Sequence, residues 1–351
     1  MRSFWSVIVL CLWATACSEV INLETEPGES QLLIYGRVTD GLEGSIIEIA
    51  RTSELNIGQE PVEGATITLI HEGGTTEQYV PVEPGIYELQ NTTIVGEPGE
   101  VYHVSIRLPN GEQYESVPAQ MPEKAGEDML DYEAKAKNIP LENGIMVRRN
   151  VVELYSTTNI FNVEEDSYLR WNVVETYLFP ERQRVVLDPP PNPPPQWCYL
   201  SYELDGQNIK LYDGSTLKTP QIPRRLIATR PIDNAFSTEY YFEVVQSSLT
   251  ADAYRYWNEL DQVANVQGSI FDRPLAPVKS NLFNVNNPDE QVLGYFEVVQ
   301  ADTIRQRIDA DDLREFNVRS SCPVVGQVGD ECFDCLLLPN SQKVKPHFID
   351  N

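Results

Sequence analysis

The residues Leu33-Ile34-Tyr35-Gly36-Arg37-Val38 alternate with a period of two, with Leu33, Tyr35 and Arg37 on one face of an extended chain. Similar stretches follow at residues 46–49 and 65–70. Turn-forming pairs stand between such stretches, at residues 40–41, 73–74, 84–85 and 110–111. Strands about ten residues apart, with no helical pattern between them, predict a β-sandwich over residues 31–122.

Parts of this region resemble the small immunoglobulin-like modules found beside carboxypeptidases and at outer-membrane transporters. The matching stretches are Pro61-Val62-Glu63-Gly64-Ala65-Thr66-Ile67, Pro84-Gly85-Ile86-Tyr87 and Tyr102-His103-Val104-Ser105-Ile106. The resemblance implies an immunoglobulin-like sandwich that either binds another molecule or acts as a spacer, and that does not catalyse a reaction.

Residues 123–143 are charged and small, and we interpret them as a junction between domains. The remainder, 144–351, is predicted to be a larger β-rich domain, with strands at 151–155, 168–178, 185–187, 199–203, 240–246 and 292–300. One helix interrupts it: Thr250 is a candidate cap, and Tyr254, Trp257, Leu260 and Ala264 recur at helical spacing. The predicted fold class is therefore mainly β, with one inserted helix.

Acidic residues outnumber basic ones by 53 to 26, which gives a net charge of −27. This balance excludes a protein that binds nucleic acid through its overall field. The longest apolar run, residues 4–13, is about half of the roughly 20 residues that a membrane-spanning helix needs.

The N-terminus has the pattern of a lipoprotein signal. Arg2, the apolar run and the small residues Ala14-Thr15-Ala16 precede Cys17, so we expect residues 1–16 to be removed and Cys17 to be lipidated. Residues 17–30 are then a lipidated tether, and the protein is anchored to a membrane without spanning it. The alternative is a plain signal peptide that ends at a cysteine.

Four cysteines remain after Cys11 and Cys17 are set aside: Cys198, Cys322, Cys332 and Cys335. An even number in an exported chain favours two disulfides, with three connectivities open. The spacing of Cys332 and Cys335 also fits a zinc ligand pair or a redox motif, but no second such pair or neighbouring histidine accompanies it. We expect no metal and no cofactor.

No catalytic constellation is found in the sequence. The three histidines, His71, His103 and His347, lack metal-ligand spacing, and nucleophile and phosphate-loop motifs are absent. Asp309, Asp311 and Asp312 are interpreted as a solvated acidic turn rather than a calcium loop. We therefore expect a protein that is not an enzyme.

Two patterns have an ordinary structural interpretation. The hexamer Tyr-Phe-Glu-Val-Val-Gln occurs at residues 241–246 and again at 295–300, and we interpret it as two similar strands rather than a duplication. The proline-rich stretch 189–195 is expected to be a stiff loop, with a partner-docking role as the alternative.

Several segments resemble the bacterial lipoprotein family called domain of unknown function 4249. The matching stretches are Gly268-Ser269-Ile270-Phe271-Asp272-Arg273-Pro274, residues 281–290, Val292-Leu293-Gly294-Tyr295-Phe296, the Tyr256-Trp257 helix, the Cys198 strand and the closing Cys332-Phe333-Asp334-Cys335. The resemblance implies an outer-membrane lipoprotein, facing the cell exterior, that assists a TonB-dependent barrel transporter in nutrient uptake. The ligand stays unknown, and the alternatives are an envelope-assembly or scaffolding lipoprotein and a hydrolase with an unrecognised carboxylate site.

Overall fold

The computed structural model describes residues 30–41, 44–52, 58–90, 92–140, 145–182, 196–204, 209–265, 278–323 and 326–350. The fold is mainly β, as the sequence predicts. Cys17, the tether up to residue 29, the expected strand at 185–187, the proline-rich stretch and residues 268–274 lie outside the described residues. None of the described helices is long and apolar enough to cross a membrane.

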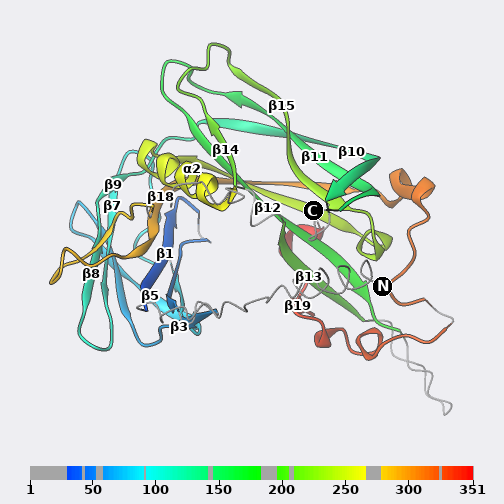
Figure 1. Cartoon of the computed structure of the whole chain (residues 1–351), viewed down its shortest axis with the longest axis horizontal. Coiled ribbons are helices and arrows are strands. Elements are labelled where there is room, and N and C mark those ends of the chain that lie inside the picture. The colour runs from blue at the N-terminus through cyan, green and yellow to red at the C-terminus, as the bar shows by residue number, and fades with distance from the viewer. Residues whose placement is uncertain are drawn as a thin grey trace, which may run out of the picture.

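The first part of the chain forms a sandwich, at the left of Figure 1. Its strands are β1 (Leu32–Thr39), β2 (Ile46–Thr52), β3 (Gln59–Pro61), β4 (Thr66–His71), β5 (Thr76–Glu83), β6 (Ile86–Leu89), β7 (Val101–Arg107), β8 (Gln113–Ser116) and β9 (Ala119–Gln120). In β1 the predicted alternation holds, because Ile34 and Val38 are buried in the sandwich core whereas Tyr35 and Arg37 lie on the other face at intermediate exposure.

Two strands from far along the chain complete this core. β17 (Leu282–Asn284) pairs with β8, and the first half of β18 (Leu293–Ile308) pairs in parallel with β1. Phe296 and Val298 of β18 are buried in the same cluster as Ile34. The division of the chain at residues 123–143 stays a prediction, but the sandwich core includes residues from both sides of it.

The second half of β18 leaves the sandwich and continues a second sheet. It pairs with β16 (Tyr240–Leu249), which pairs with β12 (Tyr168–Pro180), and β12 in turn pairs with β13 (Trp197–Leu204) and β14 (Lys210–Asp213). A single long strand thus joins the two halves of the molecule, and 16 strands of the described chain share one hydrogen-bonded network.

A separate three-stranded sheet packs on this second sheet. It consists of β10 (Gly126–Pro140), β11 (Met146–Ile160) and β15 (Gln221–Pro231). Leu154 and Ile227 of this sheet share a buried cluster with Trp171 and Phe242 of β12 and β16. The residues interpreted as a junction therefore include a 15-residue strand, β10.

η1 (Asn234–Ser237) precedes β16, and α2 (Ala251–Asn265) follows it. Short elements close the chain: η2 (Ala310–Phe316), η3 (Asp330–Cys332), η4 (Cys335–Leu337), β19 (Ser341–Gln342) and η5 (His347–Asp350). β19 pairs with β13. The C-terminal segment therefore ends against the second sheet, away from the sandwich (Figure 1).

Candidate ligand-binding site

Helix α2 is the predicted helix, and it begins where the sequence indicates. The Thr250 hydroxyl accepts a hydrogen bond from the backbone N–H of Ala253, three residues on, which satisfies one of the unpaired donors of the first turn. The buried side chains of Ala253 and Tyr256 pack with Tyr295 and Val299 of β18. The helix therefore covers the face of β18 that is turned away from the sandwich core.

Beneath the helix lies a buried ion pair between Arg170 of β12 and Glu297 of β18. The two guanidinium nitrogens of Arg170 donate to the two carboxylate oxygens of Glu297 at 2.8 and 2.9 Å, and Glu297 has no exposed surface. The indole N–H of Trp257 donates to the same carboxylate, and the Tyr35 hydroxyl donates at 3.3 Å. Four donors thus occupy both oxygens, so the carboxylate holds four elements together and has no oxygen free for acid–base work.

The surroundings of this ion pair shift the pKa values of the neighbouring tyrosines and of Arg170. Burial raises the pKa of the Tyr35 hydroxyl well above its usual range, and the charge of Glu297 adds to the effect. Burial, with a smaller contribution from Glu297, raises the pKa of Tyr256 to about 12. Burial by itself lowers the pKa of Arg170, but Glu297 and Tyr35 together more than offset this and the pKa is raised. At neutral pH the site therefore presents neutral tyrosines beside Arg170, whose Nε has no hydrogen-bond partner among the described residues.

A pocket of about 500 Å³ lies between α2 and the outer face of β1, β2 and β18. Its volume is within the range of small-molecule sites. Trp257 forms part of the wall and meets the Tyr35 ring edge-on, with ring centroids 5.4 Å apart. Exposed polar groups come from Glu48 and Gln59. The lining residues are Leu33, Tyr35, Glu48, Gln59, Tyr256, Trp257, Leu260, Val263, Val278, Leu293 and Gly294.

Gly294 allows β18 to approach β1 at this pocket. Its φ is +93°, and a Cβ at this position would lie 1.9 Å from the carbonyl oxygen of Ile34. A side chain here would force the two parallel strands apart. Gly294 therefore allows the backbones of β1 and β18 to lie close together in the wall of the pocket.

A second cavity of about 740 Å³ lies on the other side of α2, against residues 117–122 and 279–281. Charged groups line it, among them Asp166, Asp252, Arg255, Glu259 and Lys279. The apolar and aromatic walls of the first pocket make it the better candidate for a small ligand.

Comparison with known proteins places the chain in a family. The model of the domain of unknown function DUF4249 matches residues 18–305. The chain belongs to the DUF4249 family. No curated protein matches the sequence.

Two solved structures align with this DUF4249 chain at 7% identity. A biofilm associated protein B domain aligns over 80% of this chain and 87% of that chain with a TM-score of 0.16, and a biofilm associated protein BSP domain aligns over 81% and 60% with a TM-score of 0.14. Similarity at this level carries no argument about fold or function.

Residues 281–290, which lie within the span matched by the DUF4249 model, have a structural role. The Asn281 side chain donates to the backbone carbonyl of Phe296 at 2.8 Å and accepts from its N–H at 2.9 Å. The Glu290 carboxylate accepts from Tyr114 at 2.8 Å and from Asn284 at 2.7 Å. These side chains fix β17 and β18 against the sandwich, and so support the wall of the pocket.

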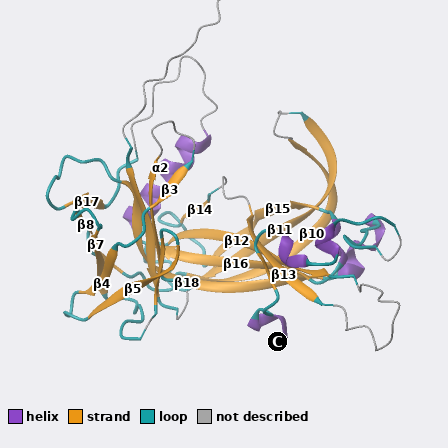
Figure 2. Ribbon diagram, turned by 90° about the horizontal axis from the view of Figure 1, so that it is seen from below, coloured by secondary structure: helices purple, strands orange, loops and turns teal. Residues whose placement is uncertain are grey.

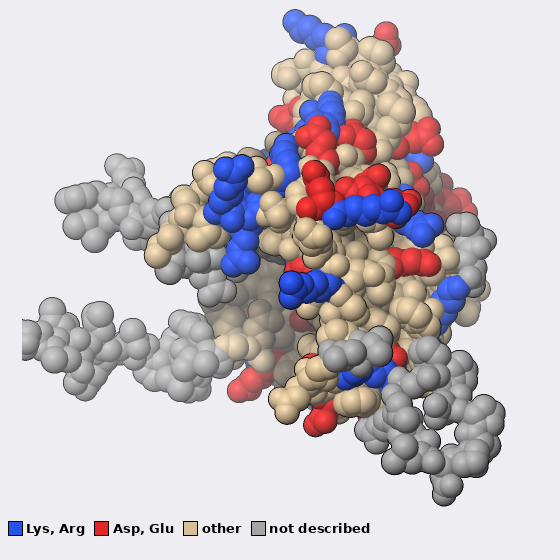
Figure 3. Space-filling model, turned by 90° about the vertical axis from the view of Figure 1, so that its right-hand side faces the viewer, with Lys and Arg blue, Asp and Glu red and all other residues tan. Residues whose placement is uncertain are grey.

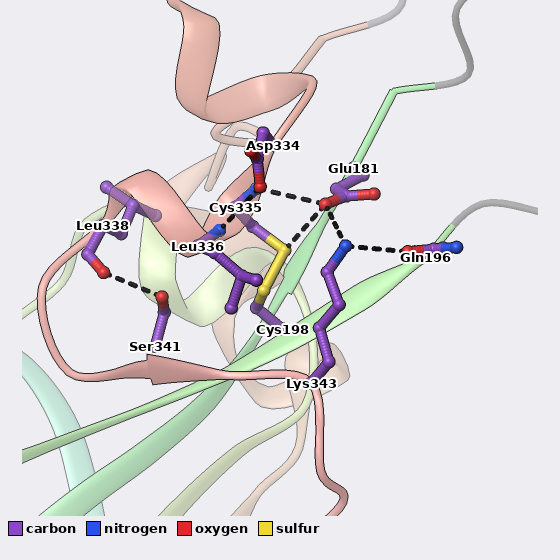
Figure 4. The surroundings of a disulfide bond; sticks show 9 residues. All are labelled: Glu181, Gln196, Cys198, Asp334, Cys335, Leu336, Leu338, Ser341 and Lys343. Atoms are coloured by element: carbon purple, nitrogen blue, oxygen red, sulfur yellow. Dashed lines mark hydrogen bonds and ion pairs between the residues drawn. A yellow bond between two sulfur atoms is a disulfide. The ribbon is translucent and has the colours of Figure 1, made fainter.

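The four predicted cysteines of the DUF4249 chain form two disulfides, Cys198–Cys335 and Cys322–Cys332. The two members of the C-x-x-C motif therefore belong to different bridges. The Cys198–Cys335 bridge joins the C-terminal segment to β13. Glu181, directly after β12, accepts from the backbone N–H of Cys335 and from Lys343, each at 3.1 Å (Figure 4).

Other candidates for metal binding in this DUF4249 chain are dispersed. Among the described residues, one group has three donors close enough for a metal, Glu181 with Cys198 and Cys335, and its two sulfurs are bonded to each other. Of the acidic turn, Asp309 caps η2 and Asp311 pairs with Arg314. Asp312 accepts from Tyr132.

The histidines of the DUF4249 chain lie on separate elements. His71 of β4 bonds Glu100 at 2.7 Å, His103 is on β7, and His347 begins η5.

Sequence reasoning missed Glu297 and Arg170. The signal was present, because Glu297 stands inside the apolar run 292–300, and a charge in the middle of a buried strand requires a partner.

Proposed function

We propose that this protein is a lipid-anchored outer-membrane protein, facing the cell exterior, which captures a small and largely apolar molecule for a TonB-dependent barrel transporter. The observation that carries the proposal is the aromatic and apolar pocket beside α2. The resemblance of the sequence to the DUF4249 lipoproteins supports the transporter as partner. The lipoprotein-signal pattern that ends at Cys17 supports the lipid anchor.

Capture fits the pocket better than catalysis. The buried carboxylate behind the wall, Glu297, is fully occupied by donors from Arg170, Trp257 and Tyr35. The polar groups at the rim, Glu48 and Gln59, are suited to orienting a ligand with one polar end. The hydrophobic effect then provides most of the affinity, and the rim gives the selectivity.

The pocket is tested with a neutral apolar fluorescent probe, N-phenyl-1-naphthylamine. Val263 lines the pocket and is 38% exposed, so Val263→Trp fills the space at little expected cost to the fold. The matched control is Val344→Trp, because Val344 is 74% exposed and is not among the residues that line the pocket.

Saturable enhancement of probe fluorescence is expected with the unaltered protein and with Val344→Trp. Val263→Trp is expected to weaken binding at least tenfold. Equal binding by all three proteins would show that the pocket is not the site of capture.

A further inference from the structure

The hairpin of β10 and β11 extends beyond the sheet to which it belongs. β15 accompanies β11 only as far as Val151, which pairs with Pro231. The Asn150 carbonyl still accepts from the backbone N–H of Ile232, and beyond it residues 137–140 and 146–149 pair with each other alone. Figure 2 shows this part of the hairpin curving away from the rest of the molecule. A two-stranded ribbon of this kind is marginal in stability by itself, so its length calls for a contact outside the described chain.

The charge of the ribbon is opposite to that of the protein. Between residues 134 and 150 the sequence has four basic residues and one acidic residue, whereas the whole chain has 26 and 53. Lys and Arg side chains gather on the projecting arm in Figure 3. We call these four residues the basic collar: Lys135, Lys137, Arg148 and Arg149.

The basic collar is arranged at some cost to the fold. Lys137 stands directly opposite Arg149 in the ladder, and like charges in that position repel. Lys135 and Lys137 each reach the carboxylate of Glu153 at 2.5 Å. Arg148 and Arg149 are exposed and form no ion pair with a described carboxylate. Two arginines therefore lack a counter-charge among the described residues.

Beyond the collar, the outermost described residues of the second strand of the ribbon are apolar. Ile145 is 59% exposed and Met146 is 58% exposed. Ile139 and Val147 pair across the ladder next to them. Arg149 follows Met146 by three residues, about 10 Å along a strand. This separation is similar to the ~5–10 Å depth at which interfacial apolar side chains lie below lipid headgroups.

The hairpin also curves toward the side of the molecule where the described chain begins. Ser30 and Gln31 are hydrogen-bonded to Thr52, and Thr52 pairs with Gln59 of β3. β3 lies on the side toward which the hairpin rises in Figure 2. If Cys17 is lipidated as proposed above, one membrane is within reach of both the anchor and the ribbon.

We propose that the described outer part of the β10–β11 hairpin, residues 145–149, docks on an anionic lipid bilayer. Ile145 and Met146 enter the interface, and Arg148 and Arg149 bind the phosphates of the headgroups. The docking would orient the tethered protein on its membrane and hold the pocket in one direction relative to the surface.

The test is sedimentation with vesicles of phosphatidylcholine containing 30% phosphatidylglycerol, compared with pure phosphatidylcholine. The full chain carries Cys17→Ser, so lipidation has no part in the result and failure here is independent of the proposed function. Arg148→Gln with Arg149→Gln removes two charges, and Ile145→Ser with Met146→Ser removes the apolar contact. The matched control, Lys218→Gln with Arg319→Gln, removes two charges from exposed positions outside the hairpin.

Both hairpin variants are expected to bind anionic vesicles at least tenfold more weakly, and the control is expected to bind as the parent does. Binding of the parent should also fall as salt is raised. Unchanged circular dichroism shows that the variants are folded.

Equal binding by parent and hairpin variants would overturn the proposal, as would equal binding to neutral vesicles. Loss of a co-purifying protein from the hairpin variants, with vesicle binding unchanged, would also overturn it and would assign the arginines to a protein partner.

Discussion

The repeated hexamer offers a matched pair of substitutions that tests the buried ion pair. Glu243 in the first copy and Glu297 in the second occupy the same position of the same six residues. Glu243 is 22% exposed and pairs with Arg305 at the surface at 2.6 Å. Glu297 is fully buried and pairs with Arg170, which is 3% exposed. Because the local sequence is the same, a difference in the loss of stability between the two substitutions reports the effect of burial.

Glu297→Gln keeps the shape of the side chain and leaves the charge of Arg170 buried without a counter-charge. Breaking a buried pair in this way destabilises by about 3–5 kcal/mol. Glu243→Gln removes a surface pair worth about 0–1 kcal/mol. We therefore expect Glu297→Gln to lower the free energy of unfolding by at least about 2 kcal/mol more than Glu243→Gln does.

The assay is urea unfolding followed by tryptophan fluorescence, with the disulfides intact. Adding Arg170→Met to Glu297→Gln is expected to recover part of the loss, because it removes the unpaired charge. Recovery is partial since Trp257 and Tyr35 lose their charged acceptor. Equal losses from Glu297→Gln and Glu243→Gln would refute the reasoning.

Three further predictions follow from the site and the chemistry of the chain. Cys17→Ala should abolish incorporation of labelled fatty acid and release the protein from the membrane fraction; continued incorporation would contradict the anchor. Protein purified from the envelope should have no alkylatable thiols before reduction, and replacing Cys198 and Cys335 by Ser should destabilise it by about 2–4 kcal/mol in urea unfolding; four reactive thiols and bound zinc would reverse this assignment. Burial opposes ionisation of Glu153, but hydrogen bonds from two lysines and a tyrosine outweigh it and lower its pKa to about 2. Since the folded pKa is below the unfolded value of about 4.3, the stabilisation is present above that pH and is lost as the pH falls toward 2. Glu153→Gln should therefore flatten the dependence of stability on pH in that window, and an unchanged acid titration of stability would contradict this.

Local patterns predicted the local structure well. The predicted helix and the strands of residues 168–178 and 240–246 correspond to α2, β12 and β16, because side-chain periodicity reports which face is buried. β15 was missed, since its sequence includes Pro223 and several arginines, and an edge strand tolerates both. β10 was interpreted as a junction because its residues are charged and small, and Glu127, Asp131 and Glu133 interrupt any apolar pattern that would predict a strand.

The sequence did not predict which distant segments contact each other. The number of disulfides followed from counting cysteines, but the pairing of Cys198 with Cys335 over 137 residues depends on the fold. The same is true of the parallel pairing of β1 with β18, which completes the sandwich and forms one wall of the pocket. Glu297 acquires its partner only when β12, β18 and α2 are assembled.

The central claim is that this protein works with a transporter, and mild-detergent purification from its own membranes tests it most directly. A tag after Asn351 is used, and the Cys17→Ala protein is the control, because confinement to the membrane raises the effective concentration of a weakly bound partner. We predict that the anchored protein recovers one TonB-dependent barrel at near-stoichiometric yield and that the control recovers much less. Recovery of envelope-assembly components alone, or of no barrel after cross-linking, would contradict the claim.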